Sequence, residues 1–361
     1  MSDPSQEEVI SLVNSLFEVN QFTKTLYALE FKIDDLNFKS KFEDLAWRLE
    51  DMSYMCRLEK MDDGKYLIIQ KFSPKKQRKW LSTSWTPRIL FAVVVAFVMI
   101  DGYVRTETAN TIVEIGNPLE MAGIYTLALL GILGIHESGH LIAARAHRLK
   151  TTWPYFIPGL PIIGIPTFGA FIQSRGLTIN REILFDVAIA GPIAGLIIAI
   201  IVSMFAAYTA PVLEGAIEED SRLVEWNYGE PLFMTASLAL FGKGGDGQVV
   251  YQTPLLFAAW VGFLITFINL LPAWQLDGGH LARTLLGSKL HRYATYGSMG
   301  VLVLLDFWLM AILILFLSSK SPSANPLDDI SPLTKNRKLA YVGIIVLAVF
   351  CAPLPSGLLP W

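Results

Sequence analysis

The sequence has few charged residues and few cysteines. Charged side chains make up 17% of its 361 residues, and the net charge of −3 gives no excess of basic residues for binding nucleic acid. Cys56 lies in a polar region and Cys351 in an apolar run, so we expect neither a disulfide framework nor a thiolate metal cluster. The opening residues, MSDPSQEE, lack the apolar stretch of a secretory signal and the Arg/Ser-rich pattern of a transit peptide. We therefore expect no cleaved targeting segment.

Apolar residues are abundant instead. They make up 53% of the chain, and the mean hydropathy of +0.45 is too high for an ordinary soluble protein of this size. A membrane-spanning helix needs about 20 predominantly apolar residues. We predict an α-helical, multi-pass integral membrane protein, surrounded by a lipid bilayer, with about six transmembrane helices centred on Arg88–Tyr103, Met121–Arg145, Ile183–Tyr208, Leu255–Leu271, Val301–Leu317 and Leu339–Pro353.

The N-terminal residues have a different character. They are polar and mixed in charge, with helical periodicity over Gln6–Phe17 and Phe42–Glu50. A β-hairpin is predicted over Met55–Phe72, with its turn at Met61–Lys65. We therefore predict a small soluble α+β domain over residues 1–80 and a membrane core over residues 85–355.

Basic residues indicate how the chain crosses the membrane. The segment PKKQRKW, Pro74–Trp80, directly precedes the first span, which favours a cytoplasmic N-terminus. The basic residues of Arg145–Lys150 and Arg283–Arg292 fall on the same side when spans are counted forward, whereas Lys335–Lys338 would fall outside and disagrees. We predict a plasma-membrane protein with its N-terminus toward the cytoplasm.

Between the second and third spans lies an apolar segment that cannot form a regular helix. Trp153–Gln173 contains four prolines and three glycines. Non-helical backbone at membrane depth is tolerated only where protein buries it or where it lines a water-filled cavity. The segment is therefore either an interfacial loop or a re-entrant β/loop wall of a site inside the membrane.

The second span contains the pattern H-E-x-x-H at His136–His140. On a helix its two histidines lie on one face and can share a zinc ion, while Glu137 lies beside them and can take a proton from a zinc-bound water. Each strongly polar residue at bilayer depth costs about 2.5–3.5 kcal/mol on insertion scales. A bound divalent cation compensates this cost, so the pattern predicts one zinc ion per chain and an active site near the cytoplasmic face.

Catalytic zinc usually has three protein ligands, so a third must come from elsewhere in the chain. The best candidate stretch is Asn269–Leu281, which breaks the fourth span at Pro272 and continues to Asp277 and His280. The second and fourth spans cross the membrane in the same direction, so both clusters can meet at a similar depth. Spacing alone does not decide between Asp277 and His280.

These patterns together resemble those of the site-2 protease family of intramembrane zinc metalloproteases, in particular its archaeal, cyanobacterial and plastid branch without a PDZ domain. The resemblance depends on HESGH, on TFGAFI at Thr167–Ile172, on AGPIAG at Ala190–Gly195 and on N-x-x-P-x-x-x-L-D-G at Asn269–Gly278. It covers roughly residues 85–355 and leaves the N-terminal 80 residues unmatched.

The resemblance implies a role for each matching residue. His136, His140 and Asp277 would be the zinc ligands, Glu137 the general base, and Asn269 a residue that holds the substrate carbonyl or its oxyanion. An unwound substrate would align along a strand formed by Thr167, Phe168, Gly169, Ala170, Phe171 and Ile172.

The function implied is regulated intramembrane proteolysis, the hydrolysis of peptide bonds in transmembrane or membrane-anchored substrate proteins. The alternative is a non-proteolytic zinc-binding membrane protein or transporter, and a membrane H-E-x-x-H enzyme with glutamate as third ligand also remains open. AGPIAG is interpreted as a packing motif, and His147 and His291 as solvated residues. Asp306, in the apolar fifth span, is left unassigned.

Overall fold

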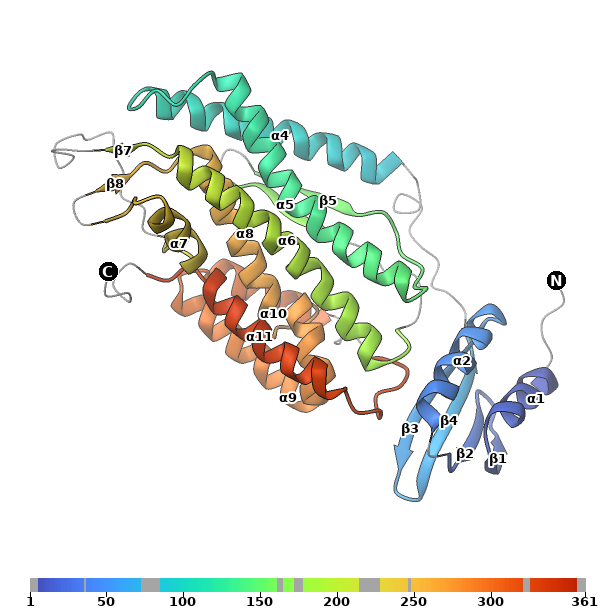
Figure 1. The fold of residues 1–361 in the computed structure, drawn as a ribbon. Coiled ribbons are helices and arrows are strands. Elements are labelled where there is room, and N and C mark those ends of the chain that lie inside the picture. Colours follow the sequence, from blue (N-terminus) through green and yellow to red (C-terminus); the bar gives the residue numbers. More distant parts are fainter. Residues whose placement is uncertain are drawn as a thin grey trace.

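The structure, a computed structural model, describes residues 6–35, 37–72, 85–160, 165–171, 178–213, 228–245, 248–320 and 325–355. This part of the chain is mostly helical, with a small α+β unit at the N-terminus and two short two-stranded sheets farther along (Figure 1). The predicted fold class is confirmed at this level. The basic segment Pro74–Trp80 lies outside the described residues.

The N-terminal unit consists of α1 (Gln6–Leu16), β1 (Val19–Lys24), β2 (Leu29–Ile33), α2 (Phe38–Asp51), β3 (Tyr54–Met61) and β4 (Gly64–Lys71). Its strands form an antiparallel sheet in the order β1-β2-β4-β3. Val13, Phe31, Leu45 and Leu67 are buried in one core between the helices and the sheet. Both predicted helices and the predicted hairpin are present, whereas β1 and β2 were not predicted.

Three helices of the described chain are long and apolar enough to cross a membrane: α4 (Trp85–Asn110), α5 (Pro118–Ala146) and α6 (Arg181–Thr209). They coincide with the first three predicted spans. The fourth and sixth predicted spans are the 17-residue helices α8 (Pro254–Leu270) and α11 (Lys335–Cys351). The short α7 (Leu232–Leu240) and the pair β7 (Val212–Leu213) and β8 (Val249–Val250) lie between α6 and α8 in the chain.

The predicted fifth span is wrong as a single helix. Instead, α9 (Asp277–Leu304) and α10 (Trp308–Lys320) are joined by a tight turn in which Asp306 has φ 64°. The chain beyond α10 returns to the beginning of α9, where Arg283 donates hydrogen bonds to Asn325 and Asp329. Hydropathy detected the apolar composition of 301–317 but could not detect the reversal of direction.

This reversal changes the side on which the last loop lies. Residues Leu327 and Asp328 pair with β3 of the N-terminal unit, and Leu354 at the other end of α11 pairs with Glu230. Lys335–Lys338 therefore lies at the same end of the molecule as the N-terminal unit, whereas counting six spans forward put it at the opposite end.

Helices α5, α6 and α8 pack side by side and position the site (Figure 1). Close contact requires a small residue at Gly262 of α8, because a Cβ there would lie 2.8 Å from Ile132 Cδ1 of α5. Helix α4 is joined to α5 by a buried polar contact in which Tyr125 and Arg105 both donate hydrogen bonds to Asp101, at 2.7 and 2.8 Å.

The Pro/Gly-rich segment after α5 forms a hairpin of β5 (Tyr155–Leu160) and β6 (Ile165–Phe171). It packs mainly against α4, with the rings of Phe91 and Phe156 in edge contact at 5.0 Å. A register shift lies between Phe156 and Pro158, which is where proline removes a donor from the ladder. The described part of this segment is therefore non-helical as predicted, while 161–164 and 172–173, with Ile172 among them, lie outside the described residues.

Candidate metal centre

Helix α5 places the two histidines of HESGH on one face. Asn117 accepts hydrogen bonds from the amides of Leu119 and Glu120 and so begins the helix, which then continues without a break through His136 and His140. Residues four apart on a helix are neighbours. The Nε2 atoms of the two histidines lie 3.2 Å apart, and both side chains are largely buried.

The third group comes from the first residue of α9. Asp277 Oδ2 lies 3.3 Å from Nε2 of His136 and 3.3 Å from Nε2 of His140. The turn between α8 and α9 brings it there, and the two glycines that follow Asp277 allow this turn to close. A Cβ at Gly278 would lie 2.1 Å from the carbonyl oxygen of Leu270, and one at Gly279 would lie 2.4 Å from that of Ala273.

His136, His140 and Asp277 are the group of described residues that can hold a metal ion, and His280 is not part of it. The geometry fits tetrahedral zinc, because ligands bonded at about 2.0–2.1 Å are about 3.3 Å from one another. The three observed separations, 3.2, 3.3 and 3.3 Å, match this value. The structure therefore favours Asp277 where spacing left the choice open.

A backbone carbonyl sets the orientation of His140. Its Nδ1 lies 2.8 Å from the carbonyl oxygen of Val187 on α6. A carbonyl oxygen can only accept, so Nδ1 must carry the proton and donate it. The neutral imidazole then presents the Nε2 lone pair to the metal position, which is the usual role of such a partner.

The AGPIAG motif provides the space for both histidines. A Cβ at Gly191 would lie 2.1 Å from His140 Nε2, and one at Gly195 would lie 2.9 Å from His136 Cβ. The contact is equally close when viewed from α5, because a Cβ at Gly139 of α5 would lie 2.5 Å from the carbonyl oxygen of Ala190 on α6. The motif is thus a packing motif, as predicted, and the surface on which it packs is the candidate metal centre itself.

Glu137 and Asn269 border the same position. Glu137 is 7% exposed, and its carboxylate interacts electrostatically with both histidines and with Asp277. Asn269, at the end of α8, has its amide Nδ2 3.5 Å from His136 Nε2. The centre therefore combines three candidate metal ligands, an acid near them and an amide donor.

The predicted substrate strand corresponds to β6 and the residue after it. The Thr167 hydroxyl donates to the Ile157 carbonyl at 3.0 Å and accepts from the Gly169 amide at 3.1 Å, and Gly169 has φ 92°. Backbone at Phe168, Ala170 and Phe171 continues the strand. A glycine is needed at residue 169 because other residues rarely adopt this conformation.

His147 and His291, which lie outside the candidate metal centre, differ in their exposure to solvent. His147 is partly exposed, with its Nε2 3.2 Å from Asp186 Oδ2. His291 is 3% exposed, so the prediction that it is solvated is wrong. It lies on α9, which continues through residues 283–292 with a kink at Gly287. Sequence reasoning also missed Val187, because a backbone carbonyl leaves no trace in residue type.

A protein-family model matches the part of the chain that carries this centre. The model of Peptidase family M50 matches residues 124–309, which include His136, His140 and Asp277. A protein of Oryza sativa subsp. indica named "Probable zinc metalloprotease EGY2, chloroplastic" is 28% identical over 75% of this chain and 50% of its own length. "Probable zinc metalloprotease EGY1, chloroplastic" of Arabidopsis thaliana is 33% identical over 63% of this chain and 42% of its own length.

The chain thus spans about half the length of the curated relatives it matches. No solved structure matches it significantly. The family match covers more than half of the chain and includes all three candidate metal ligands. The chain belongs to peptidase family M50.

Proposed function

We propose that this protein is an intramembrane zinc metallopeptidase that hydrolyses peptide bonds of transmembrane or membrane-anchored proteins. The observation that carries the proposal is the tetrahedral spacing of His136, His140 and Asp277, with both histidines on a helix, α5, that is long and apolar enough to cross a membrane. One zinc ion per chain would be held by these three residues. The names of the relatives, which include the words zinc metalloprotease, support this choice of metal.

The chemistry follows from the residues around this position. His136, His140 and Asp277 would hold a zinc ion, which would polarise a carbonyl and make a water acidic enough to lose a proton near neutral pH. Glu137 accepts that proton from the attacking water and delivers it to the leaving amine, acting as general base and then general acid. Asn269 donates its amide N–H to the scissile carbonyl oxygen, where negative charge develops.

The β5–β6 hairpin is the proposed binding surface for substrate backbone. A helical substrate must unwind before hydrolysis, and its freed backbone groups need partners inside the membrane. Among the described residues β6 pairs with β5 on one side, which leaves its other edge for strand addition. We assign this role to Thr167, Phe168, Gly169, Ala170, Phe171 and Ile172.

We propose that residues 1–80 form a soluble cytoplasmic domain and residues 85–355 the membrane-embedded core. The sheet and helices of the N-terminal unit, followed by the apolar helix that begins at Trp85, support the first boundary. The position of Lys335–Lys338 at the same end supports the orientation. The plasma membrane stays a prediction from the sequence, and the curated relatives are named chloroplastic.

The non-proteolytic alternative is less well supported. A carrier offers polar ligands along a path through the membrane, whereas the donor atoms here converge on one point. An acid placed between two metal ligands has a role in hydrolysis and none in transport. Zinc flux into proteoliposomes containing the purified chain, without peptide cleavage, would favour the carrier.

The direct test is the substitution Glu137→Gln, which preserves shape and removes the base. We expect the variant to bind one zinc ion and to lose about 10²–10⁴-fold in cleavage of a single-span substrate in proteoliposomes. Glu120→Gln is the matched control, because Glu120 is an exposed acid in the first turn of the same helix. Cleavage by Glu137→Gln at the rate of the control would refute the mechanism.

A further inference from the structure

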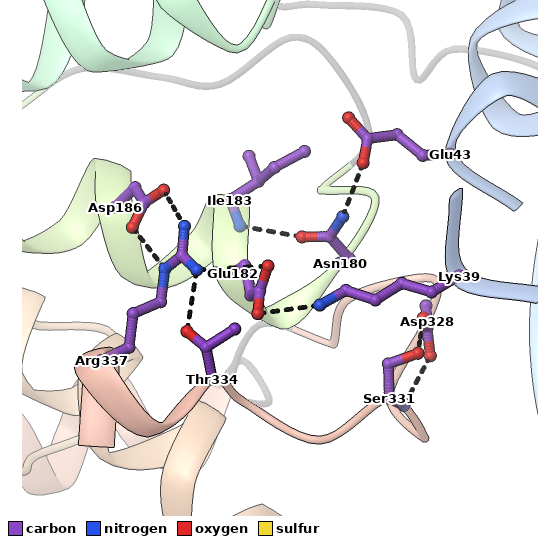
Figure 2. Close-up of polar contacts among 10 residues, drawn as sticks. All are labelled: Lys39, Glu43, Asn180, Glu182, Ile183, Asp186, Asp328, Ser331, Thr334 and Arg337. Carbon is purple, nitrogen blue, oxygen red and sulfur yellow. Dashed lines mark hydrogen bonds and ion pairs between the residues drawn. The ribbon is translucent and has the colours of Figure 1, made fainter. Parts of the chain in front are cut away.

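The N-terminal unit is seated on the membrane core at one defined place. Its α2 contacts the beginning of α6 (Figure 2). Its β3 contacts the segment before α11. Ile179, Ile183 and Leu327 are at most 5% exposed and belong to the same apolar core as the N-terminal helices and sheet. The Leu58 amide of β3 donates to the Leu327 carbonyl at 2.9 Å. The two parts of the chain therefore share a core.

Polar contacts reinforce this seat. Lys39 Nζ lies 2.8 Å from Glu182 Oε1, and the Asn180 amide donates to Glu43 at 3.4 Å (Figure 2). Asn180 also caps α6, since its Oδ1 accepts from the Ile183 amide at 2.8 Å. The N-terminal unit thus contacts the residues that determine where α6 begins.

The first two turns of α6 carry two acids that share one arginine. Arg337, at the start of α11, donates from Nε and from one terminal nitrogen to Asp186, both at 2.7 Å. Its other terminal nitrogen lies 3.2 Å from Glu182. Figure 2 shows the fork of Arg337 between these two acids, with Lys39 reaching Glu182 from the N-terminal unit. A bidentate arginine holds such a geometry better than a lysine would.

Asp186 connects this network to the metal centre. Its Oδ2 lies 3.2 Å from Nε2 of His147, the residue that ends α5. The next residue along α6 is Val187, whose carbonyl accepts the hydrogen bond from His140 Nδ1. The network therefore joins the N-terminal unit, α11, α6 and the end of α5. Its member Asp186 is one residue away from Val187, whose carbonyl orients His140, a candidate metal ligand.

We propose that Arg337 is a positioning residue, and that seating of the N-terminal unit on α6 acts through it to set the metal affinity of the centre. In the seated state, Lys39 and Arg337 together neutralise Glu182 and Asp186, and α6 is held against α5. When the unit leaves, the Val187 carbonyl is less firmly placed and His140 loses its fixed orientation. The N-terminal unit is then a regulatory domain of the peptidase. This inference rests on the proposed zinc site, and its test does not use peptide cleavage.

The test compares substitutions in the full-length chain. Leu327→Asp places a charge in the shared core without substituting any residue of the N-terminal unit itself. Its matched control is Leu26→Asp, because Leu26 is 90% exposed. Seating is followed by hydrogen exchange over Tyr54–Met61, since the Leu58 amide is bonded to the Leu327 carbonyl. Metal binding is followed by zinc competition with a chromophoric chelator and by the visible spectrum of the Co²⁺ form.

We expect Leu327→Asp to speed exchange in β3, to weaken zinc binding about 10-fold and to shift the Co²⁺ spectrum, as loss of an outer-shell partner does. Leu26→Asp should do none of these. Arg337→Gln should weaken zinc binding about 10- to 100-fold, and Arg337→Lys should restore part of the loss. Lys39→Met should weaken zinc binding by a few-fold at most, because Lys39 is exposed and such ion pairs contribute little. Lys41→Met removes the partner of Asp35 within the N-terminal unit and should have no effect on zinc binding.

Unchanged zinc affinity in Leu327→Asp despite faster exchange would overturn the regulatory role. Unchanged zinc affinity and an unchanged Co²⁺ spectrum in Arg337→Gln would overturn the proposal as a whole. This holds even if the N-terminal unit stays on α6 in the Leu327→Asp variant. A wild-type chain that binds zinc but cleaves nothing would refute the proposed function and leave this inference standing.

Discussion

The substitution Gly191→Ala tests the geometry of the metal centre most sharply. It adds one methyl group on α6, and that Cβ would lie 2.1 Å from Nε2 of His140 and 2.5 Å from two of its ring carbons. Ordinary contacts begin at 3.4 Å, so the ring must retreat by about 1.3 Å, whereas metal–ligand distances tolerate about 0.2 Å. His140 can then no longer bind the same ion as His136 and Asp277.

The size of the effect differs between metal binding and folding. Loss of one ligand of three should weaken zinc binding by more than about 100-fold, or about 2.7 kcal/mol. Overpacking costs about 1–3 kcal/mol of stability, and replacing glycine by alanine within a helix returns about 1 kcal/mol. The variant should therefore remain folded while losing its metal.

The assay is zinc content and affinity of the purified variant, with thermal unfolding measured on the same samples. Gly131→Ala on α5 is the matched control, because a Cβ there meets no atom within 4 Å. It should bind zinc like the wild type and be equally or slightly more stable. Wild-type zinc affinity in Gly191→Ala would show that His140 is not a ligand in the arrangement described.

Three further outcomes follow from the same structure. Asp277→Asn should lower zinc affinity at least about 100-fold while His280→Gln keeps one zinc per chain, and the reverse result would identify His280 as the third ligand. Asn269→Ala should retain zinc and lose about 10²–10³-fold in the rate of cleavage at saturating substrate; an effect on KM alone would contradict an oxyanion role. Tyr125→Phe removes a buried hydrogen bond to Asp101, so it should lower the free energy of unfolding in detergent by about 1.5–3 kcal/mol without changing zinc binding. Unchanged stability would show that this hydrogen bond contributes nothing.

The residues of the centre were predictable to different degrees. His136 and His140 could be paired from their spacing, because helix geometry alone puts them on one face. The choice between Asp277 and His280 depends on the turn after α8, in which Trp274 has φ 45° and two glycines pack against backbone. No periodicity encodes such a turn, so spacing left the choice open; the family resemblance implied Asp277, and the three-dimensional structure favours it.

The errors in the fold have a common physical origin. Hydropathy reports composition along the chain and is blind to direction, so 301–317 was predicted as one span although the chain reverses near Asp306. The same reversal places Leu327 and Arg337 beside the N-terminal unit. β1 was missed because most of its residues are exposed and show no alternation.

X-ray absorption at the zinc edge of the purified, full-length protein tests the central claim most directly. The account predicts one zinc ion per chain with a shell of two imidazole nitrogens, one carboxylate oxygen and one water oxygen, at about 2.0–2.2 Å. Substoichiometric zinc, or a shell with three imidazoles or with sulfur, would contradict it.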